Sequence, residues 1–320
     1  MIAAGWFFLQ YQFQDNRQTG EALFEIQPGQ SVKSIAEELE KERIIKDSLS
    51  FLLGYRFFYS GKSLKAGEYY FQFPLSEQDV LKKIIAGEVR LYSITVPEGL
   101  TRRETAHILG NRDFMDSQEF LNATNNPGLI HNLDPQAPDL EGYLFPETYQ
   151  VSKNITSSKM AEIMVAQFRQ IFLPIWENRH SSFPLTFRET IILASLIEKE
   201  TSLSEEKPLV SAVFHNRLRR GMRLACDPTI IYALKKRGEF TGNLTKKHLK
   251  MDSSYNTYLY PGLPPGPIAN PGAESLHAAL FPADADYLYF VSRNDGSHKF
   301  SKTLREHVNA VNKYQKRRPP

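Results

Sequence analysis

The stretch IILASLIEKET, residues 191–201, runs seven residues of apolar or small character straight into the carboxylate of Glu198. Apolar residues at 187, 191 and 194 precede Glu198 at helical spacings, so the pattern predicts a helix with this acid at the end of an apolar stripe. Desolvation there would favour the protonated carboxyl that a general acid needs. The same pattern also fits an amphipathic helix whose last turn simply reaches solvent with Glu198, Lys199 and Glu200.

The composition of the chain limits the kind of protein it can be. With 320 residues, of which 41% are hydrophobic, it can form two or three domains of about 100 to 200 residues, each with a core. A formal net charge of +3 is too small to indicate nucleic-acid binding. Cys226 is the only cysteine, which excludes an intramolecular disulfide, and the eight scattered histidines form no HExxH motif. We therefore expect neither a metal nor an organic cofactor.

The N-terminal segment MIAAGWFFL, residues 1–9, is apolar and uncharged, whereas a transmembrane helix needs about 20 apolar residues. It fits the cut-off end of such a helix, a misassigned start or a buried first strand. A signal peptide fits poorly, because the segment has no basic start and no small-residue cleavage site. Since the polar stretch that follows resembles a juxtamembrane spacer, we interpret residues 1–20 as the remnant of a membrane anchor with its spacer.

Residues 21–90 are predicted to form a small α+β domain. A short strand from residue 24 leads through a Pro-Gly turn to Ser31 as N-cap, then two helices, the alternating strand KAGEYYFQF and a helix stopped by Gly87. This strand, helix, helix, strand order, with its "hydrophobic, x, x, Gly, x, Ser" entry, resembles the LysM peptidoglycan-binding module. A small spacer domain without any ligand would share the same framework residues.

The chain also resembles itself, because residues 94–121 align with residues 24–51 at a constant offset of seventy. The matching pairs include Ile26 with Val96, Gly29 with Gly99 and Ser31 with Thr101, and further on residues 66–71 recur loosely as residues 141–146, with Gly67 opposite Gly142. We therefore hypothesise that the LysM-like unit is duplicated and that its second copy is fused into the next domain. A different order of strands and helices in the two segments would refute this.

The remainder of the chain mixes helices with short strands. A long stretch dense in Pro, Gly, Asn and Asp, residues 125–149, predicts a loop of functional type. Helical patterns follow from about residues 157, 186 and 207, and the stretch 286–301 predicts a hairpin with its turn at residues 294–297. The predicted fold class is therefore α+β.

Five long stretches of this second part occur in a fixed order: LEGYLFPETY (140–149), ILASLIEKET (192–201), VFHNRLRRGMRLACDPTIIY (213–232), SSYNTYLYPGLPPGPIANPG (253–272) and LYFVSRNDGSHKFSKTLREH (288–307). Together they resemble the endolytic murein transglycosylases, the YceG-like family, and the likeness runs from about residue 24 to the C-terminus. The resemblance implies a LysM-like domain followed by a catalytic domain, residues 91–320, that cuts peptidoglycan glycan strands internally.

The resemblance places the catalytic acid at the first glutamate of EKET, which is Glu198. In a lytic transglycosylase one carboxyl protonates the leaving glycosidic oxygen and then accepts the proton of the MurNAc 6-hydroxyl as that oxygen attacks C1. Glu200 is the competitor, because on a helix it points about 160° away from Glu198, so only one of them can face a given substrate. Periodicity does not discriminate between the two, and the choice of Glu198 comes from the family.

Candidate substrate-binding residues lie in the same stretches. The residues 255–258 offer amide and hydroxyl groups for sugar hydroxyls and aromatic faces for a pyranose, although such a loop also suits plain packing. Asp227 precedes a proline and also fits a simple turn or helix cap. The full set of expected substrate contacts is Glu147, Asn216, Asp227, Thr229, Tyr255, Asn256, Thr257 and Ser301.

The resemblance further implies a single-pass protein of the bacterial inner membrane, with its catalytic domain on the periplasmic side. Its substrate would be peptidoglycan glycan strands, and peptidoglycan synthases its partners in limiting or terminating strand elongation. Two other functions fit the same sequence. One is a non-catalytic peptidoglycan-binding scaffold of the envelope, and the other is a muramidase that hydrolyses the same bond with water. An assay for 1,6-anhydro ends distinguishes all three.

Overall fold

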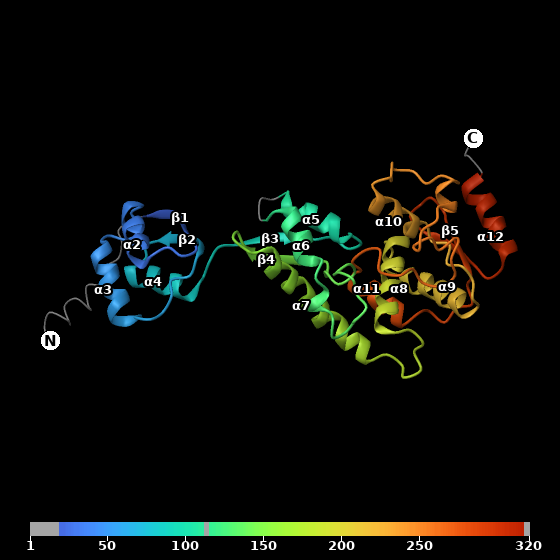
Figure 1. The fold of residues 1–320 in the computed structure, drawn as a ribbon, viewed down its shortest axis with the longest axis horizontal. Coiled ribbons are helices and arrows are strands. Elements are labelled where there is room, and N and C mark those ends of the chain that lie inside the picture. The colour runs from blue at the N-terminus through green and yellow to red at the C-terminus, as the bar shows by residue number, and fades with distance from the viewer. Residues whose placement is uncertain (1–18, 112–114, 317–320) are drawn as a thin grey trace. The chain divides into compact units, whose positions relative to one another are not determined.

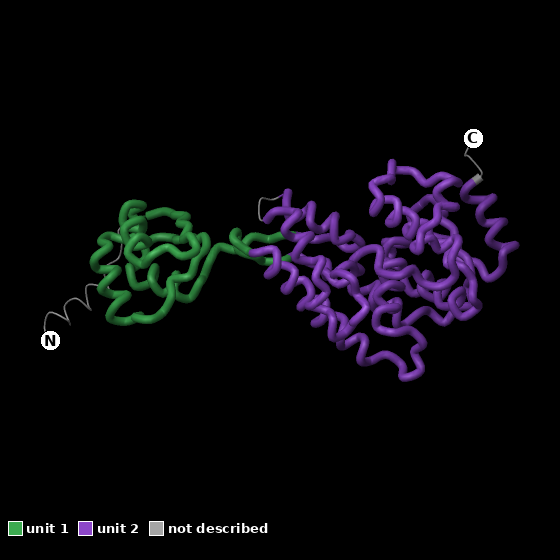
Figure 2. The backbone as a smooth tube through the Cα atoms, viewed as in Figure 1, with its two compact units in different colours: residues 1–94, 149–155 green, residues 95–148, 156–320 purple. Residues whose placement is uncertain are grey.

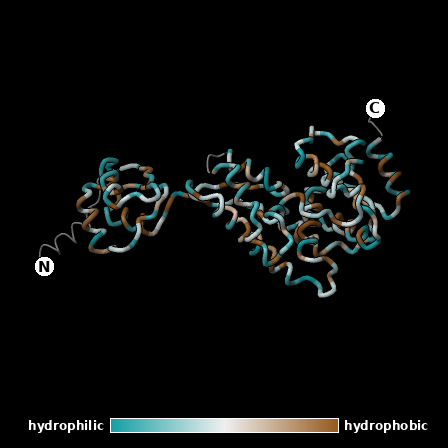
Figure 3. The backbone as a smooth tube through the Cα atoms, in the orientation of Figure 1, coloured by the Kyte–Doolittle hydropathy of each residue, from teal (hydrophilic) through white to brown (hydrophobic). Residues whose placement is uncertain are grey.

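The computed structural model describes residues 19–111 and 115–316, which fall into two compact units. Unit 1 runs to Ile94 and also includes Tyr149–Ile155, and unit 2 comprises Thr95–Thr148 and the chain from Thr156 onward (Figure 2). Helices and two-stranded sheets make up both units (Figure 1), which confirms the predicted α+β class. Hydrophobic residues alternate with hydrophilic ones along the helices of each unit (Figure 3), as expected for helices with one face toward a core.

Unit 1 is built on an antiparallel pair of strands in which Gly20 lies opposite Phe73 and Ile26 opposite Gly67. Its elements in order are β1 (Gly20–Ile26), α2 (Val32–Lys41), α3 (Ser48–Phe58), β2 (Gly67–Phe73) and α4 (Glu77–Ala86). The inner face of the strands and the apolar sides of the helices share one core, whose fully buried members include Ile26, Ile35, Leu39, Phe51, Tyr69 and Phe71. The strand, helix, helix, strand order predicted here is confirmed.

Local signals begin and end these helices. The Ser31 hydroxyl accepts the N–H of Ser34 at the start of α2, and Ser76 forms a capping box with Asp79 at the start of α4. Gly87 ends α4 in the left-handed conformation, with a φ of 75° that only glycine adopts without strain. Local sequence signals therefore set the start of α2 and both ends of α4.

A second strand, helix, helix, strand series follows along the chain. It consists of β3 (Leu91–Thr95), α5 (Arg102–Gly110), α6 (Ser117–Thr124) and β4 (Thr148–Ser152). Side-chain hydrogen bonds join Ser93 to Gln150 and Thr95 to Thr148, so the two strands run antiparallel, as β1 and β2 do. The element order on which the predicted duplication depends is thus the same in both segments.

Turn and cap residues also correspond between the two series. Gly29 and Gly99 both take positive φ, 80° and 73°, and Thr101 caps α5 as Ser31 caps α2. The looser match of Gly67 with Gly142 is wrong, because Gly67 begins β2 whereas Gly142 lies in a turn ahead of β4. The second strand of the second series comes later in the chain, after a connection that contains the 3-10 helix η1 (Pro127–Leu129).

Helix α8 (Phe187–Glu200) is the centre of unit 2. It begins at a capping box of Thr186 with Glu189, every residue from Thr190 to Ile197 is buried, and it packs against α9, α10 and α11. The helix is therefore buried on all sides, contrary to the predicted single apolar stripe. The helices around it are α7 (Ser157–Glu177), α9 (Lys207–Arg219), α10 (Asp227–Arg237) and α11 (Ala273–Leu280), with the short η2 (His248–Lys250).

The C-terminal part of unit 2 is a hairpin of β5 (Tyr289–Ser292) and β6 (His298–Ser301), followed by α12 (Leu304–Val311) and a π-helical turn, η3 (Asn312–Lys316). The predicted hairpin is confirmed. Within the described ranges no helix is long and apolar enough to cross a membrane. The predicted anchor remnant, residues 1–20, falls almost wholly on residues 1–18, outside the part that the structure describes.

Candidate active site

Glu198 lies in the last turn of α8 and points to the start of α11. Its Oε2 accepts hydrogen bonds from the Gly272 N–H at 3.1 Å and from the Ser275 hydroxyl at 2.6 Å. The same oxygen lies 3.5 Å from Lys207 Nζ, and only 7% of the Glu198 side chain is exposed. The carboxylate thus covers the positive N-terminal end of α11 and ties three helices together.

Lys207 makes this contact part of a larger ion cluster. Its side chain is 3% exposed, and besides Glu198 its ammonium lies 3.5 Å from a carboxylate oxygen of Glu98 and 3.4 Å from one of Glu274. A buried charge of this kind is tolerated only with such partners. Glu198 is therefore engaged in holding the fold at the junction of α8, α9 and α11.

Glu200 leaves the same helix end in another direction, since two residues turn an α-helix by about 200°. Its carboxyl faces the segment before α10, where it hydrogen-bonds with the Cys226 thiol. Burial is the main cause that raises the pKa of Glu200 to about 7; Asp227 adds to the rise, while His298 and Arg217 oppose it. A carboxyl with this pKa is present in both its acid and its base form at neutral pH.

Two buried threonines fix the neighbourhood of Glu200. The Thr257 hydroxyl accepts the N–H of Cys226 at 3.0 Å and lies 3.0 Å from the hydroxyl of Thr229. This attaches the loop that carries Thr257 to the first turn of α10. One residue further along the loop, the Tyr258 hydroxyl donates to Asp227 Oδ1 at 2.5 Å. An exposed carboxylate, a half-buried tyrosine and Glu200 are thereby brought together at the surface of unit 2.

His298, on β6, is held in one orientation beside this group. Glu206 Oε2 lies 2.6 Å from its Nδ1, and Glu206 Oε1 accepts its backbone N–H at 2.7 Å. Thr201, the residue after α8, donates its hydroxyl to the same Oε2 at 3.2 Å. Glu206 thus fixes the imidazole of His298 through Nδ1, in the neighbourhood of Glu200.

Two of the expected substrate contacts use their amides within the protein. Asn216 donates to the carbonyl oxygens of Ala285 and Tyr287, at 2.8 and 2.9 Å. Asn256 is fully buried and donates to two carbonyl oxygens of the preceding loop, at 3.2 and 2.7 Å. Thr229 and Thr257 are buried as well. These four side chains shape the backbone around the site, and the surface beside Glu200 belongs to Asp227 and Tyr258.

The remaining three expected contacts lie in different surroundings. Glu147 is exposed at the start of β4, where its carboxylate accepts the N–H of Thr148 at 2.8 Å. Ser301 is 2% exposed on β6, and its hydroxyl has no hydrogen-bond partner among the described residues. Tyr255 is half-buried, with its ring centroid 5.0 Å from that of Tyr232 on α10.

Sequence reasoning missed the roles of Cys226 and Glu206. Cys226 had no assigned role, yet its thiol contacts the Glu200 carboxyl. From the sequence, Glu206 could be identified only as an acid near the start of a helix. In the fold it pairs with His298, 92 residues further on. Among residues 19–111 and 115–316, no three His, Cys, Asp or Glu side chains are grouped so that they could hold a metal ion.

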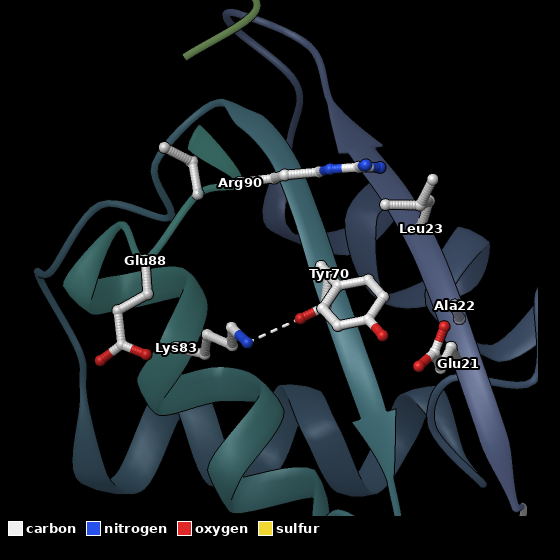
Figure 4. A pocket seen from close by; sticks show the side chains of 8 residues that line it. Glu21, Ala22, Leu23, Tyr70, Lys83, Glu88 and Arg90 are labelled. Carbon is white, nitrogen blue, oxygen red and sulfur yellow. Dashed lines mark hydrogen bonds between the residues drawn. The ribbon is translucent and has the colours of Figure 1, made fainter. Parts of the chain in front are cut away.

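Unit 1 carries a separate pocket of about 710 Å³ on the outer side of its strand pair (Figure 4). The Tyr70 ring stands in its middle with the hydroxyl toward Glu21, and the Arg90 side chain extends across toward Leu23. Lys83 Nζ donates to the Tyr70 carbonyl oxygen at 2.6 Å on the opposite side. An aromatic ring, an exposed leucine and charges of both signs therefore meet in one hollow.

Fold and site together define an α+β protein with a carboxyl of raised pKa at the end of a buried helix. The model of the YceG-like family matches residues 24–313, so the chain belongs to the YceG-like family. A curated relative from Bacillus subtilis, named endolytic murein transglycosylase, is 33% identical over 90% of this chain and 83% of its own length. A relative of the same name from Streptococcus pneumoniae is 30% identical over 89% of this chain, which spans 58% of that protein.

A crystal structure of a YceG-like protein from Listeria monocytogenes has a similar fold. Its TM-score is 0.60 at 30% identity, over 91% of this chain and 99% of that one. These comparisons confirm the family that the five sequence stretches indicate.

Proposed function

We infer that this protein is an endolytic lytic transglycosylase of peptidoglycan. The curated relatives that cover most of the chain bear that name, and the observation that carries the mechanism is Glu200, whose pKa is raised to about 7 chiefly by burial. A single carboxyl that must first give and then take a proton works best with a pKa near the ambient pH.

The reaction needs no water. Protonated Glu200 donates its proton to the glycosidic oxygen as the bond from that oxygen to C1 of MurNAc breaks. The resulting carboxylate accepts the proton of the MurNAc 6-hydroxyl while O6 bonds to C1, which closes the 1,6-anhydro ring and restores the protonated acid. A hydrolase with two carboxylates would use the second one as nucleophile or base, whereas substrate-assisted families lack it. The 2-acetamido group of the substrate would stabilise the positive charge at C1.

We propose Glu200 as this acid, whereas the resemblance placed it at Glu198. Glu198 Oε2 already has two hydrogen-bond donors and the Lys207 ammonium around it, so its contacts suit a structural role. Glu200 lies beside exposed Asp227 and half-buried Tyr258, where a substrate can reach. Asp227, Tyr258 and Tyr255 are the side chains that we propose to contact the sugar rings.

The decisive experiment is mass spectrometry of products from uncrosslinked glycan strands. We expect the wild-type protein to leave 1,6-anhydro ends and Glu200→Gln to be slower by a factor of about 10² to 10⁴, the usual contribution of general acid–base catalysis. Glu198→Gln, the matched control on the same helix turn, should retain activity and lose stability. If Glu198→Gln were inactive while folded and Glu200→Gln active, the acid would be Glu198.

The same products test the two other functions. A reducing MurNAc end that carries oxygen from labelled water would establish a hydrolytic muramidase. Binding of strands without any cleavage would establish a scaffold. As a further check, kcat/KM should fall about tenfold per pH unit above a pH of about 7, because only protonated Glu200 can start the reaction.

Location and partners form a further part of the proposal. Peptidoglycan is the substrate named by the relatives, so the protein would act in the bacterial envelope. We propose a single-pass anchor in the cytoplasmic membrane, with the catalytic unit on the outer, periplasmic side beside the peptidoglycan synthases. Protease added to intact spheroplasts should then degrade unit 2, and protection of unit 2 would contradict this orientation.

Unit 1 would hold the glycan strand, as its LysM-like element order suggests. The pocket around Tyr70 offers an aromatic face and polar groups of the kind that sugars require (Figure 4). Full-length Tyr70→Ala should bind less to insoluble peptidoglycan, with the exposed Phe57→Ala on α3 as control. Equal retention of both variants and the wild type would rule out this pocket.

A further inference from the structure

Unit 2 has a pocket of about 460 Å³ between the second repeat and α10, which the proposed chemistry does not use. Two contacts join its walls: Lys235 Nζ lies 2.6 Å from Glu104 Oε1, and the Tyr232 hydroxyl donates to Glu141 Oε2 at 3.3 Å. These ties connect α5 and the α6–β4 connection to the C-terminal half of α10. The pocket is therefore part of the folded unit and open on its remaining side.

The charges that line the pocket are unevenly neutralised. Lys235 is paired with Glu104, and Arg102 with Asp139 at 3.4 Å. The other two cations, Arg103 and Lys236, are exposed, and neither has a carboxylate within 4.0 Å in the part of the chain that the structure describes. Two positive charges thus remain available to a ligand that enters here.

Glu141, the acid at the inner wall of the pocket, does not neutralise the positive charges of Arg103 and Lys236. It is 9% exposed and accepts the Arg102 N–H at 2.8 Å. Burial raises the pKa of Glu141 to about 8, so at neutral pH its carboxyl is mostly uncharged and can donate a hydrogen bond. The pocket accordingly combines two cations without a carboxylate partner, a neutral acid and the aromatic rings of Tyr232 and Phe240, and Lys236 lies over the Tyr255 ring at 5.7 Å.

The pocket lies within reach of the acid site. Asp227, next to Glu200, begins α10, and Lys236 stands nine residues later on the same helix, which corresponds to about 14 Å along its axis. Tyr255 connects the two places, because it lines a small cavity together with Glu141, Tyr232 and Lys236. A substituent of a strand bound at Glu200 can therefore follow the loop from Tyr258, which bonds Asp227, to Tyr255 and the pocket.

We propose that this pocket binds the peptide stem of the substrate strand, with Arg103 and Lys236 as the groups that receive its carboxylates. The proposal rests on the proposed function, since it concerns the same bound strand. A neutral sugar ring needs hydroxyl partners and an aromatic face, and two unpaired cations add nothing to its recognition. A peptide stem has carboxylates for the cations and alkyl groups for the aromatic rings. The enzyme would thus distinguish strands that carry stems from bare ones.

The test compares uncrosslinked strands that carry intact stems with strands stripped of them by an amidase. For the full-length Arg103→Ala/Lys236→Ala variant, we expect KM on stem-bearing strands to rise about tenfold with kcat unchanged. On stripped strands neither constant should change. Lys159→Ala, which removes an exposed cation from α7, is the matched control and should leave KM unchanged on both substrates.

Other outcomes would overturn the proposal. An equal loss on both substrates would assign the two cations to the glycan itself, and unchanged KM on stem-bearing strands would leave them without a role in binding. If the wild type cleaved neither substrate, the proposed function would fail. Calorimetric titration of full-length protein with a soluble stem peptide separates the two cases, because the pocket requires binding by the wild type and at least tenfold weaker binding by the double variant.

Discussion

The two strand, helix, helix, strand series of this protein begin alike and end differently. Both enter their first helix through a left-handed glycine and a hydroxyl cap. In unit 1 the chain goes from the end of α3 at Phe58 to the start of β2 at Gly67. In the second series α6 ends at Thr124 and β4 begins only at Thr148. This longer connection contains Glu141, and its residues 140–146 are buried in the core of unit 2.

One side chain fixes that extra segment. Asn270 Oδ1 accepts the N–H groups of Gly142 and Leu144 at 2.8 and 3.1 Å, and its Nδ2 donates to the Leu100 carbonyl oxygen at 3.0 Å. Backbone hydrogen bonds in both directions join Asn270 to Gly99 and Leu100 as well. The same local signals thus produce a self-contained module in one place and part of an enzyme core in the other, depending on the tertiary partner.

Loss of this partner should have the largest effect. Asn270→Ala leaves two buried N–H groups unpaired and removes one of the two donors to the Leu100 carbonyl oxygen, so we expect unit 2 to lose about 3 to 5 kcal/mol of unfolding free energy. Hydrogen exchange resolved by segment measures it, and the amides of β1 and β2 should keep their protection. Asn309→Ala, at an exposed position on α12, is the control. Equal loss of protection in both series would show that unit 1 also depends on Asn270.

The buried acid of the second series should make its stability depend on pH. The folded-state pKa of Glu141 is raised to about 8 from an ordinary 4.5, so the folded form binds the extra proton and stability falls as pH rises between these values. Glu141→Gln should remove a fall of at most a few kcal/mol, since one pKa unit corresponds to about 1.4 kcal/mol. Chemical denaturation from pH 4 to pH 9 measures this. An unchanged pH dependence in the variant would contradict the raised pKa.

In unit 1 a buried glutamate should make stability depend on pH to a smaller extent. Glu77 is 3% exposed, and burial raises its pKa, but its Oε1 accepts the N–H groups of Lys46 and Asp47, which oppose the rise. The stability of unit 1 should therefore also fall as pH rises above the ordinary glutamate range, and Glu77→Gln should flatten that dependence less than Glu141→Gln does in unit 2.

The smallest expected effect concerns the shared caps. Ser31→Ala and Thr101→Ala each remove the acceptor for the N–H in the first turn of a helix, at a cost of about 1 kcal/mol. Exchange of α2 amides should increase only in the first variant and that of α5 amides only in the second. Ser31→Thr and Thr101→Ser, which keep the hydroxyl, should restore protection. A cost at one position alone would mean that the two series do not use their caps alike.

Local features of the fold could be predicted because they depend on neighbours in sequence. Ser31, Gly87 and the hairpin turn at residues 294–297 act through bonds to residues a few positions away. The choice between Glu198 and Glu200 could not be predicted in this way. Helix α8 is buried all round, so periodicity gives no preferred side, and the partners that separate the two acids, Lys207 and Cys226, lie on other helices or loops.

Polar residues of the predicted site show the same limit. The sequence gives Asn216 and Asn256 the chemistry of sugar ligands, but an amide serves equally well to satisfy buried backbone carbonyls, and the structure uses them so. Asp227 is among the expected contacts, whereas its partner Tyr258 is not, because the hydrogen bond between them joins two motifs that are 31 residues apart. The type of reaction could be predicted from the family resemblance, whereas the contacts of each side chain became known only from the fold.

The bonds of Asn270 also have a consequence for the order in which the chain folds. Its partners Gly142 and Leu144 precede it by 128 and 126 positions, and Leu100 by 170. The β1–β2 pair can form once Phe73 has been synthesised. In the second series the N–H groups of Gly142 and Leu144 lack their acceptor until residue 270 has been synthesised. Contacts of such sequence separation form slowly, and the waiting surface is exposed to wrong partners. We therefore expect newly made unit 2 to be the part of this protein that is most prone to misfold before its synthesis is complete.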